Sequence, residues 1–378
     1  MAQSSATRPT WAEIRLDNLK FNFKSSKSFI GDELRYMAVV KADAYGHGAV
    51  SCARTLSECG TDWFGVALPE EGLELRSAGI AEPILCLGGF WPGQEEFLLS
   101  NRLVPVVFRM EQARALDRAA RDHGTKSDIH VKLDTGMGRI GIRPEAAADF
   151  AENLKQFRNL KVQGLMTHFA SADKIEESNF TRSQIARFNE CVEIFRQKGF
   201  KPEFLDLANS PASVAFPESR GNMVRLGGIL YGLGDDVLPM DIDKPELKPV
   251  LSLHSRIASI KNVPKGETIG YSRTFRTDRD SMIATIPIGY HDGYRRALSN
   301  KASVIINGRL APVAGRISMD WTILDVTDIP DTNVDDEVML IGTDGTNTIT
   351  AGNLAVITDT ISYEITCGLG SRIPRKYT

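Results

Sequence analysis

Short apolar runs alternate along the chain with longer segments in which apolar residues recur at helical spacing. The runs have the composition of buried strands, and segments such as RMEQARALDRAARDHG and RSQIARFNECVEIFRQKGF are typical of amphipathic helices that end near a glycine. The predicted strands lie at residues 34–42, 63–68, 82–87, 103–108, 128–134, 161–168, 203–209 and 222–228. These successive strand–helix units predict an α/β fold, a closed (β/α)8 barrel of the TIM type. A doubly wound parallel sheet would give the same alternation.

The pattern changes after about residue 240. Segments such as LKPVLSLHSRIASIKNV and MIATIPIGY are β-branched runs broken by Gly, Pro and Asn, with little helical periodicity. This pattern predicts a separate, mainly β domain. We therefore expect a barrel over residues 8–240 and a C-terminal β domain over residues 241–378.

Charge and cysteine content argue against several classes of partner. The 45 Lys and Arg residues nearly balance the 48 Asp and Glu residues, so the net charge of -3 predicts no binding to nucleic acid. The 5 cysteines are scattered without the close pairs of a zinc or redox site, so we expect reduced thiols and no metal. The N-terminal segment lacks the apolar stretch of a signal peptide, and no later segment is apolar for long enough to cross a membrane. A cytoplasmic protein without a membrane partner is expected.

Active groups of a βα barrel gather at the carboxyl ends of its strands, so these ends are where chemistry is expected. The first predicted strand ends in VVKADAYGHG, where Lys41 interrupts an apolar run and Tyr45 follows in a loop. Burial lowers the pKa of a lysine ammonium and makes the amine available as a nucleophile or base. The alternative is a structural lysine whose ammonium reaches solvent at the strand end.

The fifth predicted strand ends in KLDTGMGRIGI, whose glycines match the G-x-G-x-x-G pattern of dinucleotide-binding turns. A dinucleotide site also requires an acidic residue at the end of the next strand to bind ribose, whereas that strand ends in His168. Lys132, Asp134 and Arg139 in this segment instead indicate a charged cluster. A tight glycine-rich turn with a solvated arginine would explain the same segment.

The last three predicted strands end in residues that could hold a phosphate: His168, then Asn209 and Ser210, then Arg225, Gly227 and Gly228. Loops after the last two strands of a barrel often bind phosphate through hydroxyl and backbone N–H groups. Each residue also has a structural explanation, such as a buried histidine, a helix-capping serine or glycines needed for packing. Together with Lys41, they predict a phosphate site that faces a lysine across the barrel mouth.

The motifs around these residues resemble those of bacterial alanine racemase from about residue 10 to the C-terminus: VVKADAYGHG, LDTGMGRIGI, MTHFASAD, LANS, RLGGILYG, IGYSRTF and GRISMD, in family order. The resemblance implies a pyridoxal 5'-phosphate (PLP) enzyme, an isomerase that interconverts L- and D-alanine and supplies D-alanine for peptidoglycan synthesis. It also implies a homodimer with shared active sites, in which the C-terminal domain of one subunit completes the site of the other.

The resemblance implies a role for each matching residue. Lys41 would bind the cofactor covalently, Tyr45, Ser210, Gly227 and Gly228 would hold its phosphate, and Asn209 would also bind the cofactor. His168 would pack near the cofactor ring, Arg139 would bind the phenolic oxygen and the substrate, and Arg225 would face the pyridine nitrogen. From the partner chain, Tyr271 would be the second base, and Met319 and Asp320 would lie near the substrate carboxylate.

Racemisation explains why these residue types are needed. A proton must leave one face of the substrate α-carbon and another must arrive on the opposite face, so two bases are required. Lys41 and Tyr271 would be these bases, and Tyr271 would need nearby positive charge. Because a guanidinium rarely gives up its proton, Arg225 would leave the pyridine nitrogen unprotonated and limit transamination and decarboxylation.

Two further positions bear on finer properties. Enzymes that this chain resembles often carry a carbamylated lysine, and carbamylation of Lys132 would let it orient Arg139. An unmodified Lys132 paired with Asp134 is the alternative. Ser371 stands where some family members have a phosphate-binding tyrosine, so we assign it no cofactor role and leave substrate preference open.

Three other functions fit parts of the sequence. A fold-related PLP decarboxylase of basic amino acids would need a carboxylate in place of Arg225. A non-catalytic PLP-binding barrel would need neither the C-terminal domain nor Tyr271. A serine or broad-specificity racemase would use the same residues, and the sequence leaves it open because substrate preference depends on pocket shape.

Overall fold

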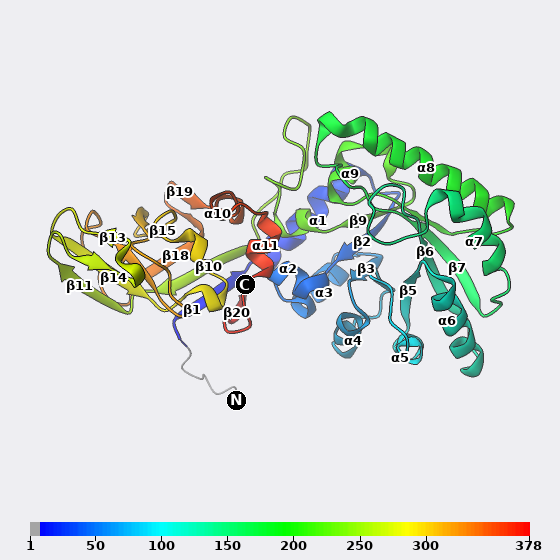
Figure 1. The fold of residues 1–378 in the computed structure, drawn as a ribbon, viewed down its shortest axis with the longest axis horizontal. Coiled ribbons are helices and arrows are strands. Elements are labelled where there is room, and N and C mark those ends of the chain that lie inside the picture. Colours follow the sequence, from blue (N-terminus) through cyan, green and yellow to red (C-terminus); the bar gives the residue numbers. More distant parts are fainter. Residues whose placement is uncertain (1–7) are drawn as a thin grey trace. The chain divides into compact units, whose positions relative to one another are not determined.

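The computed structural model describes residues 8–378, which form two compact units (Figure 1). One unit comprises residues 19–248, and the other combines residues 8–18 with residues 249–378. This division differs from the predicted one, because strand β1 (Thr10–Ile14) belongs to the second unit. There it pairs antiparallel with β10 (Leu251–Arg256) and parallel with β20 (Arg375–Tyr377). A local sequence pattern carries no information on such distant partners.

The unit of residues 19–248 is a closed barrel of parallel strands, as the sequence predicts. In order around the barrel, the strands are β2 (Arg35–Val39), β3 (Trp63–Val66), β4 (Ile84–Cys86), β5 (Leu103–Val107), β6 (Ser127–Lys132), β7 (Leu160–Met166), β8 (Phe204–Asp206) and β9 (Met223–Leu226). The ring closes where β2 pairs with β9, with Tyr36 opposite Val224. Closure excludes the doubly wound sheet, whose edges stay open.

One helix, α1, precedes the first barrel strand, and the other helices follow barrel strands and surround them (Figure 1). They are α1 (Leu16–Ile30), α2 (Lys41–Gly46), α3 (Ala49–Glu58), α4 (Pro69–Ser77), α5 (Glu95–Ser100), α6 (Met110–Asp122), α7 (Ala147–Leu154), α8 (Ser178–Gln197) and α9 (Ser210–Ala215). In α8 the buried residues include Thr181, Ile185, Phe188, Cys191 and Phe195, which recur every three or four positions. This spacing gives the helix one buried face.

Side chains from successive strands fill the barrel interior. Every barrel strand except β6 contributes one residue to a buried cluster of Met37, Trp63, Leu85, Val106, Met166, Phe204 and Met223. β6 contributes His130, whose ring centroid lies 5.5 Å from that of Trp63. Gly164 on β7 makes room for this ring, since a Cβ there would lie 2.5 Å from His130 Cε1. Burial lowers the pKa of His130 to about 3, so an uncharged imidazole completes the layer.

The second unit is mainly β, as predicted. Its largest sheet has the strand order β16-β15-β18-β10-β1-β20, with β19 paired to β18, while β11, β14 and β17 form a second sheet and β12 and β13 a hairpin. The strands and helices not yet given are β11 (Ser259–Val263), β12 (Thr268–Ile269), β13 (Phe275–Arg276), β14 (Ser281–Ile286), β15 (Ser303–Ile306), β16 (Arg309–Pro312), β17 (Thr322–Asp325), β18 (Glu337–Asp344), β19 (Asn347–Ile349), α10 (Ala351–Thr358) and α11 (Ser362–Cys367).

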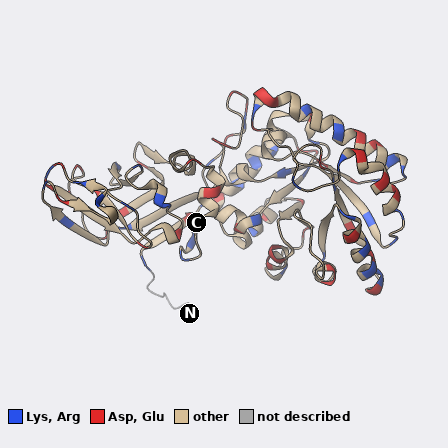
Figure 2. Cartoon of the chain, in the orientation of Figure 1, with Lys and Arg blue, Asp and Glu red and all other residues tan. Residues whose placement is uncertain are grey.

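Basic and acidic side chains are interspersed along the outer helices α6 and α8 (Figure 2). These helices therefore present no continuous surface of one charge. Within residues 8–378, no helix combines the length and the apolar character needed to cross a membrane. All 5 cysteines of the chain lie in this part, and each is a free thiol.

Candidate active site

Lys41 directly follows the short connection after β2 and begins the turn α2. This turn is left-handed, because residues 42–45 all have φ between 53° and 55°. The conformation costs an L-residue roughly 1–2 kcal/mol, since its Cβ approaches the following carbonyl oxygen. Four such residues in succession need contacts that hold them, and strain of this kind is concentrated at functional sites.

Hydrogen bonds fix both ends of the turn. At its far end, the Asp43 carboxylate accepts the N–H of Ala49 at 2.7 Å, and the Asp43 carbonyl accepts the N–H of Gly48 at 2.9 Å. At its beginning, the N–H of Ala42 donates to Oε1 of Glu71 at 2.8 Å. Glu71 lies in α4, which follows β3, the neighbour of β2 in the barrel. The segment after Lys41 is therefore tied to the adjacent strand–helix unit.

Two hydroxyl groups and a glycine meet beside this turn. A Cβ at Gly227 would lie 2.6 Å from the hydroxyl of Tyr45 and 3.9 Å from that of Ser210. The Ser210 hydroxyl accepts the N–H of Gly227 at 2.8 Å, so its own proton can be donated elsewhere. Asn209 accepts the N–H of Ala212 at 3.2 Å and caps α9. Residues that follow β2, β8 and β9 thus surround one space. A side chain at position 227 larger than that of glycine would fill this space.

Arg225 on β9 is buried and forms an ion pair with the fully buried Asp206 on β8. Its two terminal nitrogens also donate to the carbonyl oxygens of Asp206, Thr167 and Leu207 at 3.1, 2.9 and 3.0 Å. Burial raises the pKa of Asp206, whereas the adjacent guanidinium lowers it. Because a guanidinium does not readily lose its proton, a neutral Asp206 would leave a buried charge uncompensated. Asp206 is therefore the counter-ion that fixes Arg225.

His168 lies just after β7, next to the same guanidinium. Its Nδ1 is 3.3 Å from a terminal nitrogen of Arg225. A guanidinium can only donate, so Nδ1 accepts and the ring proton resides on Nε2. Burial, reinforced by Arg225, lowers the pKa of His168 well below its ordinary value. The imidazole is therefore neutral, with its N–H on the side away from Arg225.

Lys132 at the end of β6 is buried, and its amine donates to the Thr167 carbonyl at 3.3 Å. Burial and the nearby Arg225 lower its pKa well below the ordinary value. Arg139 is exposed in the loop after β6, and its charge lowers the pKa of both Lys132 and His168. The structure therefore places the charges of Arg225 and Arg139 near Lys132 at the carboxyl end of the barrel strands, where an anion would be stabilised.

The glycine-rich loop after β6 surrounds a carboxylate of the protein itself. Oδ1 of Asp134 accepts the N–H groups of Gly136 and Gly138 at 3.2 and 2.9 Å. A Cβ at Gly141 would lie 2.7 Å from the backbone nitrogen of Asp134. Both N–H groups are thus taken by Asp134, and the loop is a closed turn instead of a cradle for pyrophosphate.

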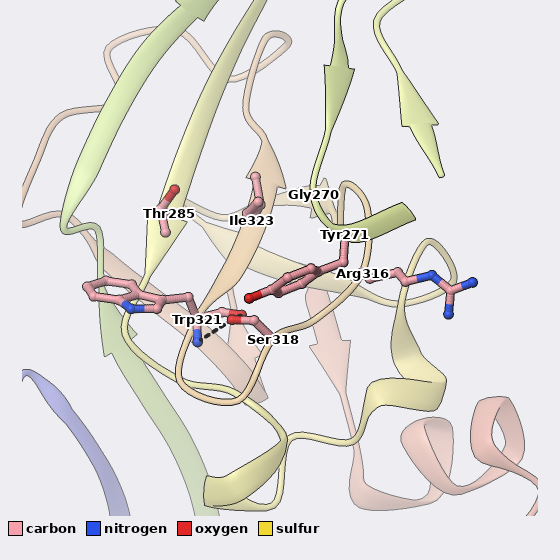
Figure 3. A pocket seen from close by; sticks show the side chains of 7 residues that line it. All are labelled: Gly270, Tyr271, Thr285, Arg316, Ser318, Trp321 and Ile323. Carbon is pink, nitrogen blue, oxygen red and sulfur yellow. Dashed lines mark hydrogen bonds between the residues drawn. The ribbon is translucent and has the colours of Figure 1, made fainter. Parts of the chain in front are cut away.

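Tyr271 belongs to the second unit, at the tip of the β12–β13 hairpin. Its neighbours Ser272 and Arg273 have φ of 58° and 52°, so this turn is also strained. The Tyr271 side chain is 69% exposed. It lines an open pocket of about 420 Å³ together with Gly270, Thr285, Arg316, Ser318, Trp321 and Ile323. Figure 3 shows its ring extending across the pocket toward Ser318 and Trp321.

Met319 and Asp320 lie in the loop between two of these pocket residues. The Met319 side chain is exposed, and its carbonyl accepts the N–H of His291 at 3.1 Å. Asp320 pairs with Arg372 at 2.8 Å. Ser371, next in sequence to Arg372, is exposed between α11 and β20. The predicted site residues therefore form two groups, one at the barrel mouth and one around the pocket of the second unit.

Asp206 and Gln184 support the barrel mouth and were not predicted from the sequence. Asp206 could have been found as a charged residue inside the apolar run EFLDLAN, since buried strands rarely carry an unpaired charge. Gln184 donates to the Thr135 hydroxyl at 3.2 Å and to the His168 carbonyl at 3.1 Å, and accepts the N–H of Ala170 at 3.1 Å. In the sequence it is an ordinary polar residue of a helix.

Comparison with known proteins gives one consistent result. The family model for the alanine racemase N-terminal domain matches residues 14–235, and that for the C-terminal domain matches residues 250–377. Alanine racemase of Halothermothrix orenii is 46% identical over 98% of this chain and 97% of its own. A solved alanine racemase from Clostridium difficile has a TM-score of 0.93 and 38% identity, covering 99% of this chain and 97% of the other.

A solved alanine racemase from Bacillus anthracis, described with bound L-Ala-P, has a TM-score of 0.92 and 36% identity, covering 99% of this chain and 96% of the other. The similarity extends over both units. It includes the strand ends with Lys41, His168 and Arg225 as well as the hairpin with Tyr271. The chain belongs to the alanine racemase family.

Proposed function

We propose that this protein interconverts L- and D-alanine with PLP bound at the mouth of its barrel. The observation that carries the proposal is the convergence of Lys41, Ser210 and Arg225 at the carboxyl ends of β2, β8 and β9. Related proteins named alanine racemase support the substrate. A buried ion pair such as Arg225–Asp206 and a strained turn such as residues 42–45 would be unusual at a purely structural barrel end, because each reduces stability.

The barrel residues fit the parts of the cofactor. The hydroxyl groups of Tyr45 and Ser210 with Gly227 and Gly228 suit a phosphate, and Asn209 shapes the adjoining turn. Within residues 8–378, both terminal nitrogens of Arg225 donate hydrogen bonds to protein acceptors. The Nε–H of Arg225 is therefore the donor that would bind the pyridine nitrogen.

Lys41 would hold the cofactor covalently, His168 would pack beside its ring, and Arg139 would bind its phenolic oxygen and the substrate. When bound, PLP supplies an electron sink for negative charge at the substrate α-carbon. Asp206 keeps Arg225 charged, so the guanidinium would not pass its proton to the pyridine nitrogen. This property would favour racemisation over transamination and decarboxylation, and it argues against the decarboxylase alternative.

Two bases would exchange the α-proton. The amine of Lys41 would act on one face of the α-carbon, and the hydroxyl of Tyr271 of the partner subunit on the other. Positive groups at the barrel mouth, Arg225 and Arg139, would stabilise a tyrosinate that approached it. The neutral His168, with its proton on Nε2, could donate a hydrogen bond to such an oxygen.

We propose that the protein acts as a homodimer, with alanine bound in sites that two subunits share. The homodimer is supported by exposed side chains in and next to the pocket of the second unit. Tyr271, Met319 and Trp321 are 69%, 51% and 46% exposed there. Exposed aromatic and apolar groups of this size are typical of surfaces that a second chain covers. Met319 and Asp320 of the partner subunit would lie near the substrate carboxylate. The ion pair of Asp320 with Arg372 would reduce repulsion between the two carboxylates.

We further propose that the enzyme acts in the cytoplasm and supplies D-alanine for peptidoglycan. The free thiols of the described cysteines agree with a reducing compartment. A serine or broad-specificity racemase remains the main alternative, since Ser371 leaves substrate preference open. A non-catalytic PLP-binding barrel is a second alternative and fits the sequence less well.

The proposal is tested by incubating the PLP-loaded protein separately with L-alanine and L-serine and following optical rotation. We expect the L-alanine signal to decay to zero faster than that of L-serine. Decay of L-serine alone would replace alanine by serine as the substrate, and no decay of either would reject racemase activity. Borohydride reduction and peptide mapping should place the pyridoxyl group on Lys41, and its attachment to another lysine would reject the cofactor assignment.

A further inference from the structure

Glu71 uses both oxygens of its carboxylate to join two neighbouring loops of the barrel. Oε1 accepts the N–H of Ala42 at 2.8 Å, and Oε2 accepts the N–H groups of Ala67 and Leu68 at 2.6 and 3.2 Å. Through Oε2 alone, Glu71 would be an ordinary capping residue in the first turn of α4. Its second oxygen has no part in that cap and instead reaches the segment that carries Lys41.

The bond to Ala42 has a direct consequence for Lys41. The N–H of Ala42 and the carbonyl of Lys41 belong to one planar peptide unit, so holding this N–H fixes the rotation of the backbone after Lys41. The same peptide leads into the four left-handed residues 42–45. A turn that is intrinsically unfavourable relaxes unless its surroundings determine it. The carboxylate of Glu71 provides such a constraint from outside the turn.

We propose that Glu71 is a positioning residue for Lys41: it holds the left-handed turn so that the lysine amine points into the barrel mouth. The proposal rests on the cofactor and base roles of Lys41 given under the proposed function. In this proposal Glu71 acts only through the peptide between Lys41 and Ala42.

The geometry explains why a carboxylate is needed. N–H donors approach this side chain from two sides, and glutamate offers an acceptor oxygen to each of them. Glutamine of the same shape has one acceptor oxygen, and its NH2 group would face an N–H on the other side. Glu71→Gln therefore preserves size and can still cap α4, but it cannot satisfy both loops.

Asp117 offers a matched control at the opposite end of the barrel. Its Oδ1 accepts the N–H of Asn159 at 2.8 Å, which ties α6 to the residue before β7. Like Glu71, Asp117 is half-buried and joins two barrel segments through a backbone N–H. Asp117→Asn makes the same carboxylate-to-amide change at the amino end of the strands, away from Lys41, and it keeps the one acceptor oxygen that the N–H of Asn159 needs.

The test uses the PLP-loaded protein without substrate, measured by hydrogen–deuterium exchange with mass spectrometry and by circular dichroism in the visible absorption of the cofactor. In Glu71→Gln, we expect peptides covering residues 41–48 to exchange about tenfold faster, as loss of one charge-assisted hydrogen bond predicts. The visible circular dichroism should change, because it reports the orientation of the cofactor held by Lys41. Asp117→Asn should leave both the exchange of residues 41–48 and the cofactor spectrum unchanged.

Steady-state kinetics is a second test of the proposal with the same variants. Glu71→Gln should lower kcat for L-alanine by about tenfold or more, with KM changed less than about twofold, because a displaced base weakens the reaction more than binding. Unchanged exchange at residues 41–48 would overturn the proposal, since Glu71 would then be only a helix cap. A cofactor spectrum and kcat equal to those of the parent would also overturn it. Failure of the parent to racemise alanine would instead reject the proposed function, while exchange and dichroism would still decide the role of Glu71.

Discussion

Arg225 and Asp206 form an ion pair between adjacent barrel strands, and their side chains are only 3% and 0% exposed. Buried pairs of this kind rarely add to stability, because removing two charges from water costs about as much as their attraction returns. The pair instead fixes the direction of the guanidinium, whose terminal nitrogens are all directed at protein acceptors. Its location at the end of β8 and β9 therefore indicates a functional role.

Asp206→Ala should lower the free energy of unfolding by about 3–5 kcal/mol, because Arg225 would stay buried without its counter-ion. Removing both charges, in Asp206→Leu combined with Arg225→Met, should cost clearly less than the sum of the two single changes. Urea unfolding of the single and double variants measures this coupling. Additive costs would show that the two side chains do not act as a pair.

Protonation of His130 should destabilise the protein as the pH falls. The pKa of His130 is lowered to about 3 in the folded protein, so between roughly pH 6.5 and pH 3 only the unfolded chain binds this proton. The stability contributed by the neutral ring is fully present above that window and is lost as the pH falls through it. The free energy of unfolding should therefore decrease by up to about 1.4 kcal/mol per pH unit from this group.

Urea unfolding at several pH values measures this slope. His130→Met should reduce the slope by about one proton, since methionine can fill the space beside Gly164 without titrating. His123→Gln is the control for loss of a histidine, because His123 is exposed at the end of α6. Identical slopes in the parent and in His130→Met would contradict the assignment.

Lys132 should react with carbon dioxide. Burial and Arg225 lower the pKa of its ammonium, so the neutral amine is available to add to carbon dioxide and release a proton. The resulting carbamate would be negative and could pair with Arg139. Protein equilibrated with ¹³C-labelled bicarbonate should show a carbamate resonance that is absent from Lys132→Arg, which cannot be carbamylated. The same spectrum in both proteins would favour an unmodified lysine.

The barrel could be predicted because most of its strands are almost entirely buried and appear in the sequence as short runs rich in apolar residues. The range 161–168, for example, overlaps β7 (Leu160–Met166), and the predicted helix around Phe188 and Cys191 is α8. Strand β1 was not predicted, because TWAEI is short and its partners lie at the other end of the chain. Pairing over such a separation depends on tertiary structure and leaves no local pattern.

The site was predictable only in part, for a related reason. Lys41, Ser210 and Arg225 stand at strand ends, where polar residues interrupt apolar runs and the barrel topology gathers them. Glu71 and Gln184 act through hydrogen bonds to backbone groups of other loops. Such contacts depend on how loops fold, and the same residue types occur on many exposed helices. The left-handed turn at residues 42–45 likewise has no sequence signal, since three of its four residues are not of the types that favour it.

The central claim is that Lys41 and the Tyr271 of the partner subunit exchange the α-proton of alanine on opposite faces. Loss of either base should lower the rate by roughly 10²–10⁴-fold. Tyr271→Ala should still bind PLP, because Lys41 remains, and Lys41→Ala should lack the covalent attachment. Each variant alone would therefore be nearly inactive for a different reason.

Mixing these two variants under conditions of subunit exchange tests the claim most directly. A hybrid dimer has one site with both bases intact and one with neither. Random exchange of equal amounts should therefore restore about a quarter of the parent activity toward L-alanine, since half of the dimers would be hybrids. Mixtures in which hybrid dimers are verified by mass spectrometry but the activity stays at the level of the separate variants would contradict the account.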